Sequence, residues 1–206
     1  MDNLAPEAKT DVAPVVQTGE GGSTPTLALH SIVATGPLRS AAAETIKANH
    51  YTKSVPAGKS HYVIFGPAIV VWSIPANRFI AKALGVSSVW ELSRLWAPDG
   101  HEPNLLSRVI SAAVREIKLL ERPDALVSYA DPNVGHSGGV YRAASWKEWP
   151  GSVETRMYRH VTTGEVRARR SFHSGRAGLR KADIEALGFR EFKAKPKIRF
   201  VKVLNA

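Results

Sequence analysis

Polar residues gather at the end of one expected strand, in a segment whose composition is typical of a binding site. Residues 125–130 are predicted to form a strand that ends at Asp131 and leads into a glycine-rich stretch with His136 and Tyr141. Side chains at strand ends commonly line a ligand site, and glycines let a ligand approach the backbone. A carboxylate there can accept a proton and a phenol can donate one. Three plainer interpretations stay open: Asp131 as a turn residue, Tyr141 in the core, and His136 exposed in a loop.

A second candidate site is the loop at residues 97–103 together with the long helix expected after it. Apolar residues recur at helical spacing over residues 105–120 and form one broad stripe. The first amides of such a helix carry partial positive charge, so they can bind an anion such as a pyrophosphate. Neither a P-loop GxxxxGK[ST] sequence nor a Rossmann fingerprint is present. An ordinary strand-to-helix turn is the alternative.

The composition excludes several kinds of chemistry. The chain has 206 residues and no cysteine, which rules out disulfides, Cys-ligated zinc and thiol nucleophiles. No apolar run reaches the roughly 18 residues of a membrane span, and the N-terminus lacks the basic region of a signal peptide. We therefore expect a cytoplasmic protein with no membrane partner. The oligomeric state is left open, a dimer included.

The positive charge is concentrated in the last quarter of the chain. Residues 156–206 contain 14 Lys or Arg against 4 Asp or Glu, whereas the first 155 residues contain 14 of each sign. Such a concentrated field favours a polyanion, because each neutralised phosphate releases counterions. A solubilising tail is the alternative, but apolar residues are interleaved with the charges and indicate folded structure.

We expect the basic region to contact the phosphates of double-stranded DNA. The candidate cations are Arg167, Arg169, Arg170, Arg176, Arg180, Lys181, Lys193, Lys195, Lys197 and Arg199. Four tryptophans are candidates for stacking on a base, with core packing as the alternative for each: Trp90, Trp96, Trp146 and Trp149.

The elements that must position these residues alternate between strands and helices. Helices are expected at residues 37–49, 78–84, 105–120, 139–143 and 179–187. Strands are expected at residues 61–65, 68–73, 88–95, 125–130, near 146, and at 154–160 and 197–203. This order predicts an α/β (α+β) fold with a mixed central sheet flanked by helices. Residues 1–35 lack periodic apolar residues and are predicted to form a flexible leader, and residues 36–206 a single domain.

Several separated blocks of the chain, in the same order, resemble the Mom family of phage DNA-modification proteins. The blocks are residues 50–59 (HYTKSVPAGK), 91–95 (ELSRL), 104–110 (NLLSRVI), 128–141 (SYADPNVGHSGGVY) and the basic C-terminal part. The resemblance covers roughly residues 45–204. It implies a GNAT-like acyltransferase fold, acetyl-CoA as cofactor, and adenine in duplex DNA as substrate. The implied product is an N6-carbamoylmethyl (acetamido) adenine that shields phage DNA from host restriction.

The resemblance also assigns roles to particular residues. His50 and Tyr51 match the family's His-Tyr pair, Arg94 a strand arginine, and Ser107 the helix motif. Asp131 and Tyr141 match the later block. Tyr141 is then placed to protonate a leaving thiolate, as in GNAT-like enzymes, and Asp131 or Glu91 to accept a proton from the adenine amine.

Cofactor and metal assignments follow from the same resemblance. The expected cofactor contacts are Leu95, Gly100, His101, Asn104, Leu105, Ser107 and Arg108. The usual GNAT pyrophosphate signature, Arg/Gln-x-x-Gly-x-Gly/Ala, is absent. Iron is also suggested for the family, and candidate ligands are His50, Tyr51, Asp131 and His136.

Two other functions remain open. One is a GNAT-like enzyme that acylates a small amine or a protein lysine, and the other is a non-catalytic DNA-binding protein. The resemblance places the protein in the cytoplasm of an infected bacterium.

Overall fold

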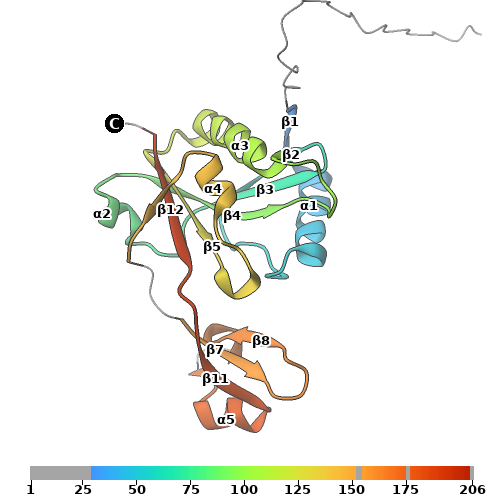
Figure 1. The fold of residues 1–206 in the computed structure, drawn as a ribbon, viewed down its shortest axis with the longest axis vertical. Coiled ribbons are helices and arrows are strands. Elements are labelled where there is room, and N and C mark those ends of the chain that lie inside the picture. Colours follow the sequence, from blue (N-terminus) through green and yellow to red (C-terminus); the bar gives the residue numbers. More distant parts are fainter. Residues whose placement is uncertain (1–28, 152–154, 175–176, 205–206) are drawn as a thin grey trace, which may run out of the picture.

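A seven-stranded mixed sheet forms the centre of the molecule (Figure 1). The computed structural model describes residues 29–151, 155–174 and 177–204. The strand order is β1-β2-β3-β4-β5-β12-β6, and β4 and β5 are the one parallel pair among the described strands. The strands are β1 (Ser31–Ala34), β2 (Ser60–Phe65), β3 (Ala68–Ser73), β4 (Val89–Trp96), β5 (Ala125–Ala130), β6 (Lys147–Trp149) and β12 (Ile198–Val203).

Helices cover both faces of this sheet, as the sequence predicts for an α/β fold. They are α1 (Gly36–Asn49), α2 (Ile80–Leu84), α3 (Leu105–Glu121) and α4 (Gly139–Ala143). The main apolar core joins α3 and α4 to one face, while smaller cores lie under α1 and α2 on the other. Among the described residues, no helix is both long and apolar enough to cross a membrane.

Helix α3 forms where the 3.6-residue periodicity is clearest. Its apolar stripe includes Val109, Ile110 and Ile117, none of which is accessible to solvent. Fully burying such a side chain contributes about 1.5–3 kcal/mol. The helix is therefore a rigid support for the loop before it and for the strands beneath it.

The leader expected over residues 1–35 extends too far, because a strand lies within its last residues. Residues 31–34, which composition places in it, form strand β1, which pairs antiparallel with β2 and buries Ala34 under α1. A four-residue edge strand has too few residues for a periodic pattern, and β2 provides its hydrogen-bond partners. Residues 1–28 lie outside the described residues.

The C-terminal region contains a small lobe inserted between β6 and β12. Its three-stranded sheet consists of β7 (Thr155–His160), β8 (Val166–Ala168) and β11 (Phe189–Ala194), covered by α5 (Lys181–Ala186). Two short strands, β9 (His173–Ser174) and β10 (Ala177–Gly178), and a 3₁₀ turn, η2 (Arg169–Phe172), complete it. We call residues 155–194 the basic lobe, since they contain ten Lys or Arg and four Asp or Glu. Figure 1 shows it as a separate projection beyond the central sheet.

The basic lobe has its own apolar core. Tyr158, Phe172, Ile184 and Phe189 pack together between the small sheet, η2 and α5. The end of the chain then returns to the central sheet as β12. The basic region of the sequence is therefore shared between an inserted lobe and a central strand.

The parallel strands β4 and β5 separate before they end. Their pairing stops at Leu92 and Ser128, although β4 runs on to Trp96 along β3. Ser93 is an additional residue in β4 relative to β3, since Trp72 pairs with Leu92 but the preceding residue pairs with Arg94. Such a β-bulge bends a strand and changes the direction of its side chains. A gap in the sheet results.

Candidate active site

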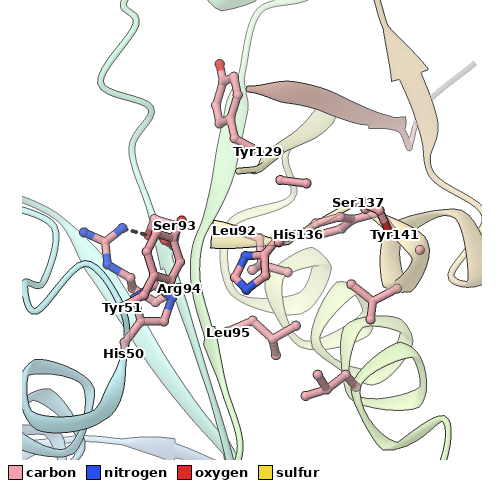
Figure 2. Close-up of a pocket in the computed structure, with 16 residues that line it drawn as sticks. His50, Tyr51, Leu92, Ser93, Arg94, Leu95, Tyr129, His136, Ser137 and Tyr141 are labelled. Carbon is pink, nitrogen blue, oxygen red and sulfur yellow. Dashed lines mark hydrogen bonds between the residues drawn. The ribbon is translucent and has the colours of Figure 1, made fainter. Parts of the chain in front are cut away.

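A pocket of about 340 Å³ occupies the gap between β4 and β5 (Figure 2). Its walls come from the end of α1, from β4 and β5, from α3, and from the glycine-rich loop that leads into α4. The lining residues are His50, Tyr51, Leu92, Ser93, Arg94, Leu95, Leu106, Tyr129, Ala130, Gly135, His136, Ser137, Gly138, Gly139, Val140 and Tyr141.

The pocket is lined from both faces of the sheet. Leu95 pairs with Val70, whose side chain packs in the core under α3, so Leu95 lies on that face. Arg94 pairs with Val71 in the core under α1 and lies on the opposite face. A ligand in the pocket can therefore contact side chains from both faces of the sheet.

Tyr141 is held in the wall of the pocket by a buried serine. Its hydroxyl lies 2.8 Å from Ser128 Oγ, which is also 2.7 Å from the carbonyl oxygen of Leu92. The ring stacks on Phe200 with centroids 5.0 Å apart. Burial, only partly offset by the bond to Ser128, raises the pKa of Tyr141 to about 12. The hydroxyl thus keeps its proton at neutral pH.

The loop before α4 requires glycine at one position. Gly138 has φ +83°, and a Cβ there would lie 2.3 Å from the ring of Phe200. A larger residue would push the loop away from β12 and displace Tyr141. This close approach explains why Gly138 is present in the glycine-rich segment that the sequence predicts as part of a site.

A cluster of three aromatic rings forms another side of the pocket. The rings of His50 and Tyr51 have centroids 4.5 Å apart, and His136 meets Tyr51 edge-on at 5.1 Å. These residues come from chain segments about 85 positions apart, and the fold brings them together. His136 is exposed in its loop, as its plainer interpretation expects, and its ring also lines the pocket.

His50 is buried and neutral. Its Nδ1 accepts a bond of 3.2 Å from the backbone N–H of Thr52 and lies 2.9 Å from the hydroxyl of the same residue. Burial, followed by the charges of Arg94 and His136, lowers the pKa of His50 to about 4. Because Nδ1 is the acceptor, the proton of the neutral ring is on Nε2.

Arg94 acts on the loop that follows the His-Tyr pair. Its Nε donates to the carbonyl oxygen of Ser54 at 2.8 Å, and its Nη2 lies 3.1 Å from Ser54 Oγ. Its Nη1 donates to the carbonyl oxygen of Ser93 at 2.5 Å. The guanidinium thereby ties the bulge in β4 to the loop carrying His50 and Tyr51.

Asp131 lies beside the pocket and not in its lining. Its Oδ1 accepts from the backbone N–H of Asn133 at 3.0 Å and from Asn133 Nδ2 at 2.8 Å, and its Oδ2 lies 3.3 Å from Lys197 Nζ. Burial alone would raise the pKa of Asp131, but the bonds from Asn133 and Lys197 outweigh it and lower the pKa. The carboxylate is ionised at neutral pH and holds the turn together.

Glu91 and Ser107 are farther from the pocket than their proposed roles suggest. Neither lines it. The charge of Glu91 reaches it, because this charge adds to the effect of burial in raising the pKa of Tyr129. Ser107 donates its hydroxyl proton to the carbonyl oxygen of Asn104 at 2.9 Å, in the first turn of α3.

The expected cofactor contacts other than Ser107 lie in three places. Leu95 lines the pocket, whereas Leu105 is buried in the core. The remaining ones lie in the loop and first turn of α3. They are Gly100 and His101, which are exposed, Asn104, whose φ is +62°, and Arg108, which pairs with Glu102 at 3.2 Å.

The start of α3 fits an anion. No side chain caps the helix, and Leu106, the second residue of α3, lines the pocket. The apolar wall of the pocket therefore continues to the N-terminus of α3, a helix of 17 residues, where an anionic group of a ligand can bind.

The iron hypothesis finds no support in the geometry. Among the described residues, no three side chains of the His, Cys, Asp or Glu types lie close enough to hold a metal ion together. His50, Tyr51 and His136 line the pocket, but Asp131 is engaged elsewhere. We derive no step through iron.

Seven of the ten expected DNA-binding cations belong to the basic lobe, and three of these seven pair with acidic side chains. Arg167 pairs with Glu165, Arg180 with Asp183, and Lys181 with Glu191. Such exposed pairs are weak, so these cations can exchange partners. Arg169 and Arg170 lie in η2, Lys193 in β11, and Lys195 in the link to β12, while Arg176 lies outside the described residues. Lys197 and Arg199 lie near the pocket, because Lys197 pairs with Asp131 and Arg199 is opposite Tyr129 in the sheet.

The tryptophans mostly have structural roles. Trp90 and Trp146 are buried in the main core, and Trp96 packs under α1. The core alternative is correct for these three. Trp149 is 38% exposed on the edge strand β6.

Ser128 and Tyr129 also belong to the site, although the sequence patterns assign them no role. Ser128 holds Tyr141, and Tyr129 lines the pocket from the opposite face. A small polar residue within the otherwise apolar strand 125–130 is the signal that could have identified Ser128. Tyr129 has no such signal, since strand aromatics are common.

A protein-family model matches nearly all of the described chain, including the segments that form the pocket. The model of the Mom protein family matches residues 33–205. No curated protein matches the chain. Among solved structures, the chain is similar to a Bacillus subtilis acetyltransferase in complex with CoA, with 8% identity and a TM-score of 0.45, over 85% of this chain and 99% of that one. The family match includes every segment that lines the pocket.

Proposed function

The chain belongs to the Mom protein family, and from this we propose that it is a phage DNA-modification enzyme. The proposed reaction is transfer of a two-carbon group to the N6 amine of adenine in double-stranded DNA. The proposed product is N6-carbamoylmethyl adenine, which protects phage DNA from restriction in the cytoplasm of the infected bacterium.

One observation carries the proposal: side chains from both faces of the sheet line the pocket, and the two sides differ in chemistry. The α3–α4 side is apolar, with Leu95, Leu106 and Val140, and ends in the proton-bearing Tyr141. The opposite side is aromatic and basic, with Tyr51 and Arg94. A donor and an acceptor of different character can therefore be bound at the same time, which removes much of the entropic barrier to their reaction.

The donor side fits acetyl-CoA. Its apolar wall suits the pantetheine arm, and the uncapped start of α3 suits the pyrophosphate. Bound acetyl-CoA would supply two carbons, and acyl transfer from it would bond N6 to the carbonyl carbon, release the thiol of CoA and give N6-acetyl adenine. The carbamoylmethyl product instead has N6 bonded to a methylene carbon and contains an amide nitrogen, so it requires a nitrogen donor and a further reaction beyond acyl transfer. Tyr141 lines the pocket and holds a proton at Oη, and its pKa of about 12 makes it a proton donor for the departing thiolate and not a base.

The acceptor side fits a neutral purine. His50 presents a neutral ring with its proton on Nε2, which can donate to a ring nitrogen of adenine. Tyr51 and His136 offer aromatic surface for a base. The adenine amine is a weak nucleophile because its lone pair is delocalised, so orientation and exclusion of water must contribute.

Reaction at N6 requires the base to leave the duplex. The pocket lies within the sheet, so a stacked base cannot reach it and must be extruded. The net charge of +10 supports a polyanionic substrate. The same charge disfavours a lysine-bearing protein substrate, which is the alternative acylation reaction.

Mass spectrometry of deoxynucleosides from a plasmid co-expressed with the protein tests this function. We expect a deoxyadenosine whose mass increase corresponds to a carbamoylmethyl group. That group differs from an acetyl group by one additional nitrogen and one additional hydrogen, so the two products are distinguished. Unmodified DNA together with acylated lysines would favour the alternative enzyme. Unmodified DNA with salt-sensitive duplex binding would favour a non-catalytic DNA-binding protein.

A further inference from the structure

A row of three side chains crosses the central sheet next to the pocket. Cross-strand pairing places Arg199 of β12 opposite Tyr129 of β5 on one side and opposite Trp149 of β6 on the other. Residues paired directly across antiparallel strands point to the same face. With neighbouring strands about 4.8 Å apart, the row is roughly 10 Å long.

The row alternates aromatic and cationic groups. The guanidinium carbon of Arg199 lies 5.9 Å from the ring centroid of Tyr129, within the range of a cation–π contact. Its Nη2 donates to the carbonyl oxygen of Gly151 at 3.2 Å. Its Nε is buried and finds no hydrogen-bond partner among the described residues.

The row connects the pocket to the solvent-exposed edge of the sheet. Tyr129 lines the pocket, and Trp149 is exposed on the edge strand. Helix α2 packs on this face of the sheet against Val89, Ala125, Val127 and Val201. The helix therefore covers other positions of the face, and Trp149 keeps its exposed ring.

A further cation lies between the row and the mouth of the pocket. Lys197 is two residues before Arg199, and its side chain is 44% exposed. Its charge also acts on His50 in the pocket. The ion pair of 3.3 Å with Asp131 places its ammonium group beside the pocket, where it can contact a phosphate of a bound nucleotide.

We propose that this row binds the DNA strand that carries the extruded adenine, with the base next to the target stacked on Trp149. The proposal rests on the proposed function and names how its substrate is held. Aromatic side chains on an open sheet face, interleaved with cations, suit unstacked nucleotides, because each base has a face to stack and each phosphate a charge to neutralise. The row begins at the pocket, so the strand entering the pocket lies along it.

Binding of full-length protein to DNA with a short unpaired bubble around one adenine tests the row. Fluorescence anisotropy of labelled DNA measures the affinity without requiring catalysis. We expect Trp149→Ala and Tyr129→Leu each to weaken binding on the order of tenfold, the effect of losing one base–aromatic stack. Trp149→Phe retains a ring and should bind within about twofold of wild type.

The matched controls are on α3. Leu119 is 78% exposed there, and Leu119→Ala removes an exposed apolar side chain outside the row. Arg115→Gln removes an exposed cation and is the control for Arg199→Gln. Folded Trp149→Ala and Arg199→Gln proteins that bind the bubble as tightly as these controls would overturn the proposal. An equal loss in Trp149→Phe and Trp149→Ala would also overturn it.

The outcome is separable from the proposed function. Wild-type protein that modifies deoxyadenosine, combined with row variants that bind like the controls, would reject the row alone. Binding that depends on the row, combined with unmodified deoxyadenosine, would reject the proposed reaction and support the row.

Discussion

The hydroxyl of Tyr141 lies 2.8 Å from that of Ser128, and both are buried at the point where β4 and β5 separate. The serine has one proton to share between Tyr141 and the carbonyl oxygen of Leu92. When Ser128 donates to Leu92, its oxygen accepts from Tyr141. Ser128 holds the tyrosine oxygen in place in either arrangement, and the phenol proton is available to a ligand in the pocket when Ser128 donates to Tyr141.

Removing the serine hydroxyl should impair activity more than stability. Ser128→Ala leaves the Tyr141 hydroxyl without its partner, so we expect modification of deoxyadenosine to fall roughly tenfold, with a loss of stability of about 1 kcal/mol. Rates come from nucleoside mass spectrometry, and stability from urea unfolding. Ser60→Ala is the control, because Ser60 is equally buried and bonded to Arg39 outside the pocket. Equal activity in the two variants would remove Ser128 from the mechanism.

Arg94 is expected to act through the loop that it holds. Arg94→Lys keeps the charge but loses the paired bonds to Ser54, so His50 and Tyr51 should become less ordered. We expect modification to fall on the order of tenfold. Arg39→Lys is a matched control, since Arg39 makes the same kind of double contact to Ser60. Its effect should be confined to stability, and equal activities of the two variants would argue against this role.

The buried His50 predicts a particular dependence of stability on pH. Its pKa is about 4 in the folded protein, below the ordinary value of 6.5. Between these values the unfolded chain binds more protons, so the free energy of unfolding should decrease as the pH falls from about 6.5 to about 4. The contribution is fully present above the unfolded pKa. Urea unfolding of wild type and His50→Asn measures it: the variant should lose less stability over this interval, and parallel curves would contradict the assignment.

The basic lobe and its link to β12 should together set the salt dependence of duplex binding. Arg180 is 86% exposed and Lys195 is exposed in the link to β12. Replacing both with Gln should weaken binding to all sequences similarly and reduce the slope of log K against log salt by about 2. The same pair of changes at Arg115 and Lys118 on α3 should leave the slope unchanged. A slope that stays constant in the lobe variant would place the phosphate contacts elsewhere.

The sequence predicts long elements well because their periodicity is a physical requirement of burial. The stripe of α3 has to face a core, and the expected range 105–120 differs by one residue from the helix that forms. Strand β1 was missed because its four residues depend on β2 for pairing. The inserted lobe was only partly predicted. Residues 154–160 and 179–187 were expected as a strand and a helix, but β8 and β11 were not.

The site was predicted in its parts and not in its arrangement. Spacing identifies the segment from Asp131 to Tyr141, but nothing local shows that His136 meets Tyr51 across the pocket. The plainer interpretation of Asp131 is also correct, since it closes a turn through Asn133. Tyr141 is both a core residue and a pocket residue, two roles that the sequence treats as alternatives. Contacts between distant segments come from the fold, which local patterns do not encode.

The central claim is that one pocket, lined from both faces of the sheet, joins the donor to adenine. The most direct measurement is the fraction of modified deoxyadenosine in plasmid from cells expressing wild type, Tyr141→Phe or Tyr51→Leu, with Leu119→Ala as the control. The two pocket variants change the donor side and the acceptor side respectively. We predict modification by wild type and by the control, and a loss of about 100-fold or more in each pocket variant. Unmodified deoxyadenosine with folded wild-type protein, or full modification by both pocket variants, would contradict the claim.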